Sequence, residues 1–195
     1  MNALTRSVAT LLVVIAACLV GPVTPTVAAA PTTVTIDLSD FRPGDTFRPF
    51  SYWRQGLVFP LEQCAPSCAD WEIGWIQGDE ALWQPPGWRP LKGTFLVPVS
   101  ELSLDVAPAL QGTARYVLTV YGFAGQLLAE KAVTVTQDFG DPENSGFGHF
   151  SVAVSHLPSP ATSFVFYNVF VRSSFPNTFV PFGVSSISLG VGGQR

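Results

Sequence analysis

Tryptophan side chains gather in one part of this chain, between residues 50 and 90. Four of the five stand close in sequence to carboxylate, amide and guanidinium groups. The apolar C–H face of a sugar ring can stack on an indole, while polar side chains hold its hydroxyls. The alternative is that the indoles are buried and fix a long connection onto the fold. The candidate ligand-binding residues are Trp71, Trp75, Trp83, Trp88, Asp70, Glu72 and Arg89.

A second group of candidate ligands is an acidic loop that contains Asp138, Asp141 and Glu143. Carboxylate oxygens are the donors that Ca²⁺ prefers, although the spacing is not that of an EF-hand loop. A solvated acidic turn is the other interpretation. Asp37 and Asp40, together with Glu101, form a weaker candidate cation site. No other cofactor is expected.

Groups suited to catalysis are few. The chain has two histidines, His149 and His156, and it lacks a Gly-x-Ser-x-Gly elbow, a His-Glu-x-x-His motif and a phosphate-binding glycine loop. Two carboxylates facing each other across a cleft could hydrolyse a glycoside. The sequence does not show whether any two do, so we favour a protein without enzymatic activity.

The first 29 residues have the organisation of a secretory signal peptide. Arg6 precedes an apolar run over residues 8–20, and small residues follow, with cleavage expected after Ala28 or Ala29. We therefore expect a secreted, extracellular or periplasmic protein. The alternative is a lipid anchor at Cys18, because Ile15-Ala-Ala-Cys18 resembles a bacterial lipobox.

Two cysteines remain after the leader, in the run Cys64-Ala-Pro-Ser-Cys68. In an oxidising compartment such a pair should form a disulfide that closes a small loop. A redox pair or half of a metal site is the alternative, but redox pairs usually have two intervening residues. We expect a structural disulfide.

Composition excludes several functional classes. The formal net charge is −4, with 14 carboxylates against 10 Lys and Arg, so nucleic acid is an unfavourable partner. Aromatic residues reach 12 % and charged residues only 12 %, which is opposite to the balance of disordered chains. No segment after the leader is long and apolar enough to span a membrane.

The remainder of the chain reads as short β segments separated by turns, with no convincing helix. Residues 30–190 are expected to form one domain, a β-sandwich or barrel of roughly ten strands, followed by a tail at 191–195. Residues 50–90 have weak strand signals and are interpreted as a long, decorated Trp-rich loop. The candidate strands are residues 33–38, 52–59, 72–77, 93–99, 102–106, 115–121, 127–135, 147–154, 163–171 and 184–189.

Two of these segments carry more specific predictions. Residues 115–121 and 127–135 should form a hairpin in which Gly125 supplies a positive φ. Residues 163–171 are apolar on both faces, as expected of a strand in the middle of a sandwich. Asn168 interrupts that run, and its amide must either find a buried partner or face a pocket.

The order of elements resembles a known fold family. The pattern comprises Thr35-Ile-Asp-Leu-Ser-Asp-Phe41, Tyr52-x-x-x-Gly56-Leu-x-Phe59, Phe95-x-Val-Pro-Val-Ser-x-Leu-Ser-Leu104, Leu118-x-Val-Tyr121-x-x-x-Gly125-x-x-Leu128 and Phe182-Gly-Val-Ser-Ser-Ile-Ser-Leu189. It looks like the galactose-binding-domain-like jelly roll of carbohydrate-binding modules and of many secreted bacterial proteins. The resemblance implies an all-β, antiparallel jelly-roll sandwich, and it speaks to fold more than to function.

Members of that group often carry an acidic residue in the closing strand. Here Ser185 or Ser186 occupies the matching position, so a calcium or ligand contact from that carboxylate is not expected. We therefore expect a non-catalytic domain that binds carbohydrate or a cell-envelope glycan. The alternative is a structural or adhesive protein that contacts another cell-surface protein, and a glycoside-acting enzyme comes third. Exposure of the indoles of residues 71–88 would distinguish the first two.

Overall fold

The structure is a computed structural model of the whole chain. The residues that it describes are 32–38, 50–60, 72–76, 79–83, 90–108, 112–137, 148–172 and 182–192, with the backbone alone at 72–76 and 79–83. The predicted signal peptide, the lipid anchor at Cys18 and the disulfide between Cys64 and Cys68 lie outside these ranges.

Within the described ranges the chain forms ten β-strands and two short 3₁₀ turns, and every strand pairing is antiparallel. This confirms the all-β prediction. No helix in this part of the chain has the length and apolar character needed to cross a bilayer. The elements are β1 (Thr32–Asp37), η1 (Trp53–Gln55), β2 (Leu57–Val58), β3 (Glu72–Ile76), β4 (Asp79–Trp83), β5 (Leu91–Pro108), β6 (Gly112–Tyr121), η4 (Phe123–Gly125), β7 (Leu127–Gln137), β8 (Phe150–Val154), β9 (Ala161–Arg172) and β10 (Phe182–Val191).

Strand β5 is shared by two sheets. Its first half pairs with β9 on one side and with β2 on the other, whereas its second half pairs with β10 and β8. The pairing with β9 shifts register between Thr94 and Val99, where the strand passes from one sheet to the other. We call β2, the first half of β5, β9, β6 and β7 the first sheet. The second sheet contains β8, the second half of β5 and β10, with β1 and β4 on the far side of β10 and β3 beyond β4.

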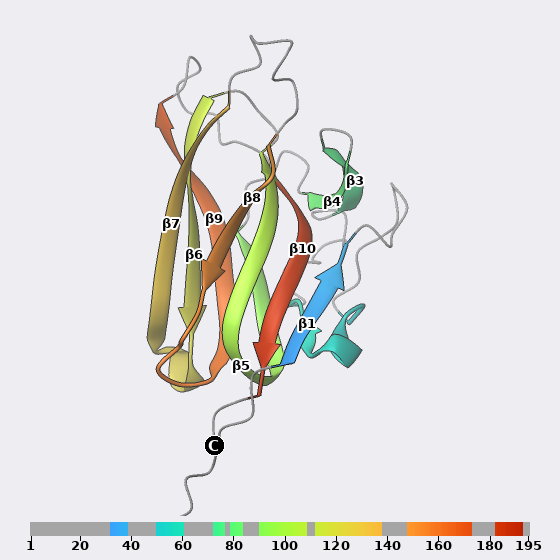
Figure 1. Cartoon of the computed structure of the whole chain (residues 1–195), viewed down its shortest axis with the longest axis vertical. Helices are drawn as coiled ribbons and strands as arrows, with labels where there is room; N and C mark the ends of the chain where they lie inside the picture. Colours follow the sequence, from blue (N-terminus) through green and yellow to red (C-terminus); the bar gives the residue numbers. More distant parts are fainter. Residues whose placement is uncertain are drawn as a thin grey trace, which may run out of the picture.

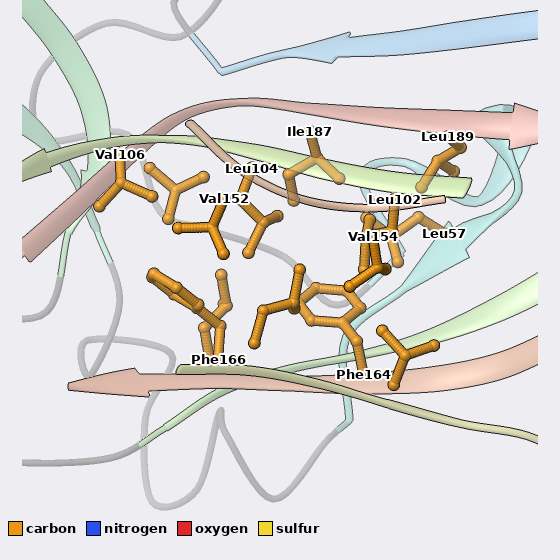
Figure 2. Close-up of a cluster of buried hydrophobic side chains, with 14 of the residues drawn as sticks. Leu57, Leu102, Leu104, Val106, Val152, Val154, Phe164, Phe166, Ile187 and Leu189 are labelled. Atoms are coloured by element: carbon orange, nitrogen blue, oxygen red, sulfur yellow. The ribbon is translucent and has the colours of Figure 1, made fainter. Parts of the chain in front are cut away.

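The two sheets stack face to face as a sandwich. Figure 1 shows β7, β6 and β9 on the left, and β5, β10 and β1 on the right. In Figure 2, Phe164 and Phe166 of β9 face the aliphatic side chains of the other sheet, among them Leu104 and Ile187. Complete burial of such side chains stabilises the fold by roughly 1.5–3 kcal/mol each. Because alternate side chains of each strand point into this core, the others form an outer face on each sheet.

An aromatic cluster at one end of the core surrounds Tyr116 of β6. Its ring centroid lies 4.7 Å from that of Phe150 and 6.2 Å from those of Phe166 and Phe182. Burial raises the pKa of Tyr116 to about 12, and a hydrogen bond with the Asn168 side chain acts in the opposite direction. Asn168 stands directly across from Tyr116 in the β6–β9 pairing. The amide that interrupts the apolar run of β9 thus has a buried hydroxyl partner.

The hairpin between β6 and β7 is formed as predicted. Gly125 has a φ of 77°, and Ala124 also adopts a positive φ, of 60°. The backbone N–H of Gly122 donates to the carbonyl of Gln126 at 2.8 Å, which closes the loop. The prediction of a positive φ at Gly125 is confirmed.

Three local predictions need correction or extension. Residues 52–59 form the 3₁₀ turn η1 and the two-residue strand β2 rather than one strand. The strands expected at 93–99 and 102–106 are a single strand, β5. The Trp-rich region contains the β3–β4 hairpin, of which β4 was not expected.

Strand β9 is central in its sheet, as predicted, because it lies between β5 and β6. Its outer face is only partly covered, since Val165 and Tyr167 are half-buried. Val169 and Val171 are 48 % and 57 % exposed, because their positions alternate with the core positions and lie on the outer face of the first sheet.

Candidate functional site

The segment at residues 50–59, which contains η1 and β2, presents exposed apolar side chains on an anchored backbone. Tyr52 and Phe59 are buried at its two ends, and their rings meet edge to face with centroids 6.2 Å apart. Between them, Leu57 is fully buried and pairs with Phe95 of β5. The segment is therefore held against the core from beneath, while the residues of its turn remain at the surface.

The turn itself is closed by backbone hydrogen bonds. The N–H of Gly56 donates to the carbonyl of Trp53 at 3.1 Å, and the N–H of Leu96 donates to the carbonyl of Gly56 at 2.8 Å. Gly56 has a φ of 87°, and a Cβ atom there would lie 2.6 Å from a methyl carbon of Val97. Glycine is required at this position both for its backbone conformation and for close contact with β5.

Four residues at this turn make up what we call the aromatic margin: Phe50, Trp53, Arg54 and Leu96. Phe50, Trp53 and Leu96 are 59 %, 54 % and 56 % exposed. The guanidinium carbon of Arg54 lies 5.5 Å from the centre of the Trp53 ring, a cation–π contact worth about 0.5–1 kcal/mol at an exposed site. The margin combines two exposed aromatic rings with a cation, and exposed apolar groups of this kind can contact a ligand.

The sequence-predicted tryptophans divide between described and undescribed residues. Trp71, Trp88, Asp70 and Arg89 lie outside the described residues. The backbone of the β3–β4 hairpin includes Glu72, Trp75 and Trp83.

Within that hairpin the register separates two of the predicted binding positions. Position 72 pairs with position 83, and position 75 pairs with position 80. Because consecutive strand positions alternate between faces, Glu72 and Trp83 occupy positions on one face of the hairpin and Trp75 a position on the other. Position 83 also pairs with Gly183 of β10, so the hairpin extends the second sheet. The register therefore does not place positions 75 and 83 on one shared face.

The candidate cation sites are not formed within the described part of the chain. Asp138, Asp141, Glu143 and Asp40 lie outside it. Asp37 pairs with Ser186, whereas Glu101 pairs with Gly190, four residues further along β10. At about 3.3 Å per residue this places the two positions roughly 13 Å apart along the strand. The described residues contain no group of three acidic, cysteine or histidine side chains that could hold a metal ion.

His149, Asp105 and Ser185 come together on the outer side of the second sheet, a grouping that no motif in the sequence predicts. Nδ1 of His149 lies 3.8 Å from a carboxylate oxygen of Asp105 and 3.4 Å from the hydroxyl of Ser185. A nucleophilic relay needs the carboxylate and the hydroxyl on different ring nitrogens. Here both approach the same nitrogen, and the Ser185 hydroxyl also donates to the Asp105 carbonyl at 3.4 Å. The contacts join β8, β5 and β10 and do not form a relay.

The outer faces of the two sheets differ in chemistry. Cross-strand pairs on the first sheet set Val165 beside Thr119, Tyr167 beside Val117 and Val169 beside Arg115. One row of the second sheet carries polar groups across four strands. It consists of Asp37 of β1, Ser186 of β10, Asp105 of β5 and Ser151 of β8.

Sequence reasoning did not select Trp53 as a binding residue, because it stands apart from the cluster at 71–88. The signal that could have found it is local. Trp53 lies between Tyr52 and Gly56, so a buried aromatic anchor and a glycine turn enclose it. A large ring in such a turn is directed away from the core unless the turn itself is covered.

Comparison with protein-family models and with curated proteins finds no match. Among solved structures, one similar protein is CsCBM6-3 from Clostridium stercorarium, in complex with cellobiose, at 12 % identity over 82 % of this chain and 94 % of that chain, with a TM-score of 0.38. A family two carbohydrate esterase from Cellvibrio japonicus has 14 % identity over 82 % of this chain and 34 % of that chain, with a TM-score of 0.37. A DUF4465 family protein from Bacteroides caccae has 12 % identity over 83 % of this chain and 74 % of that chain, with a TM-score of 0.42. With TM-scores of 0.37 to 0.42 these similarities are loose, and the β-sandwich described above rests on the strand pairings of this chain.

Proposed function

We propose that this protein is a non-catalytic carbohydrate-binding domain and that the aromatic margin contacts the glycan. The observation that carries the proposal is Trp53, a large aromatic side chain that is half exposed on a backbone fastened to the core. An open indole in water is a site where apolar contact with a ligand lowers the free energy.

The anchoring of the turn favours ligand binding, in addition to the exposure of the Trp53 ring. Tyr52 and Leu57 fix the turn from below, and Gly56 fixes it to β5. A ring held on such a turn loses little conformational entropy when a ligand arrives, so more of the contact energy appears as affinity. Phe50 is joined to the same turn, since its carbonyl accepts the N–H of Trp53 at 3.3 Å. The margin thus carries two exposed aromatic residues on one turn, which could serve a glycan longer than one sugar.

The expected export signal is consistent with this function. A secreted or lipid-anchored domain meets polysaccharides outside the cell and at the cell envelope, and these are the glycans that we propose as ligands. The predicted residues at 70–89 could add contacts of their own. The proposal does not depend on them.

The experiment compares Trp53→Ala with the matched control Phe123→Ala. Phe123 is 84 % exposed and lies in the η4 loop, at the lower left of Figure 1, whereas η1 lies at the lower right. Affinity electrophoresis through gels containing soluble plant and bacterial polysaccharides, followed by a glycan array, identifies the retained glycan. Trp53→Ala should weaken retention by about 30-fold or more, as expected for a central aromatic contact. Phe123→Ala should leave retention unchanged.

Two results would contradict the proposal. One is wild-type protein that no polysaccharide retards and no arrayed glycan binds. The other is a folded Trp53→Ala variant that binds as the wild type does. Concentration-dependent dimerisation without glycan retention would instead favour the adhesive alternative, for which Val169 and Val171 on the outer face of β9 are the exposed apolar contacts.

A further inference from the structure

We infer that the glycan bound at the aromatic margin is acidic, so that a sugar ring packs against Trp53 or Phe50 while its anionic group pairs with Arg54. This inference rests on the proposed function and adds the chemical class of the ligand to it. Three observations carry it: the position of the Arg54 guanidinium, the absence of a carboxylate beside it in the described part of the chain, and the distribution of charge over the sandwich.

The first observation is the geometry of Arg54. Its guanidinium lies over the Trp53 ring, with the central carbon 5.5 Å from the ring centroid. A guanidinium is a planar group whose N–H donors form a rigid fork that matches a carboxylate or a sulfate in two-point contact. When it lies against a ring, its donors remain at the edge of the plane and available to a ligand. The indole thus holds the cation in place.

The second observation concerns the ion-pair and hydrogen-bond partners of Arg54. Among the described residues, no ion pair or hydrogen bond joins Arg54 to a carboxylate, and the Trp53 ring is its recorded contact. A neutral sugar would offer this cation hydroxyl oxygens only. An acidic sugar would offer a charge-assisted hydrogen bond, which is roughly twice as strong as a neutral one.

The third observation is that the described carboxylates lie away from the margin. Asp37, Glu101 and Asp105 occupy positions on the outer face of the second sheet, and Glu130 lies on the edge strand β7. The margin lies beside the first half of β5, on the first sheet. Exposed charges are screened beyond about 8 Å at physiological ionic strength. These four carboxylates therefore oppose an anion at the margin only weakly.

The test uses two pairs of glycans that differ mainly in charge: polygalacturonate with its methyl ester, and dextran sulfate with dextran. Biolayer interferometry of the full chain measures Kd for each immobilised glycan at 50 and 300 mM NaCl. The wild type should prefer the acidic member of at least one pair by about tenfold or more, as expected for a hydrogen bond to a charged group. The pair that shows the preference identifies carboxylate or sulfate as the anion.

Three variants locate the effect. Arg54→Gln should remove the preference and keep the Trp53-dependent binding to the neutral glycan. Arg54→Lys should restore it only in part, because an ammonium is a point charge without the planar fork. Arg115→Gln removes an exposed cation of β6, outside the margin, and should leave the preference unchanged.

The outcomes separate this inference from the proposed function. Equal binding to both members of each pair, weakened by Trp53→Ala, would overturn the inference and leave the proposed function standing. A preference that Arg115→Gln reduces as much as Arg54→Gln would also overturn it, because general electrostatic attraction would then be the cause. Failure to bind any glycan would remove both.

Discussion

The two outer faces of the sandwich are built by the same alternation of side chains, yet among the described side chains only the strands of the first sheet leave large apolar groups exposed. On the second sheet, hydroxyls and carboxylates occupy neighbouring strands, and the hydroxyls of Thr35 and Ser188 hydrogen-bond to each other at 3.2 Å. On the first sheet, Val169 and Val171 are left exposed, and the aromatic margin lies beside the same sheet.

This difference indicates where a ligand would bind most favourably. Hydroxyl and carboxylate groups are well solvated in water, so covering them costs free energy unless each finds a new partner. Exposed aromatic and aliphatic groups gain free energy when they are covered. The first-sheet side is therefore the side from which a binding partner would gain most.

The largest expected effect is on the free energy of unfolding, and it arises from Tyr116 in the core between the two sheets. The pKa of Tyr116 is raised to about 12 in the folded protein, against 10.0 for an unperturbed tyrosine. The unfolded chain therefore releases this proton first as the pH rises. Stability is fully present below pH 10 and should fall by about 2–3 kcal/mol as the pH approaches 12. Urea unfolding at intervals between pH 9 and 12 measures the loss.

The control is Tyr116→Phe, which lacks the ionisable hydroxyl. It should be less stable at neutral pH by about 1 kcal/mol, because the hydrogen bond to Asn168 is lost. The difference between wild type and variant should then shrink and reverse in sign by pH 12, because only the wild type loses about 2–3 kcal/mol in the alkaline range. A difference that stays constant up to pH 12 would show that Tyr116 does not ionise with a raised pKa.

The smallest expected effect comes from the second sheet. Asp105→Asn removes the negative partner of His149, and both side chains are partly exposed. Stability should change by no more than about 1 kcal/mol, the range of surface ion pairs. Glycan binding should not change, and the same affinity electrophoresis measures it. If this variant lost glycan binding while remaining folded, the glycan would bind at the second sheet and not on the first-sheet side.

Much of the fold could be predicted, because the strands bury one face and alternate regularly. The hairpin of β6 and β7 is the clearest case, since Gly125 marks its loop and apolar residues alternate on both sides. The closing strand β10 follows the same rule at Val184, Ile187 and Leu189, with one register shift between Val184 and Ser186.

The failures have physical causes that a single sequence does not reveal. The segments 93–99 and 102–106 are predicted as two strands, but β5 continues through both and changes partners where its pairing with β9 shifts register. Pro98 lies at this shift, where a missing N–H is tolerated. β4 has the sequence Asp-Glu-Ala-Leu-Trp, which lacks the β-branched residues that usually indicate a strand. Its pairing with β3 and β10 forms it nonetheless.

The site was harder to predict than the fold. Five tryptophans in one region favour ligand binding, but exposure depends on which segment is anchored from beneath, and this is a tertiary property. Trp53 is exposed because Tyr52 and Leu57 occupy the interior positions of its segment. The composition of the segment does not distinguish Trp53 from Trp75 or Trp83.

The most direct test of the account is to follow the five indole N–H signals by NMR while the retained glycan is added. The Trp53 signal is assigned from its absence in Trp53→Phe. Our account predicts that this signal shifts progressively and saturates with the same Kd as that measured by interferometry. An unchanged Trp53 signal, with shifts confined to Trp71, Trp75, Trp83 or Trp88, would contradict the aromatic margin as the binding site.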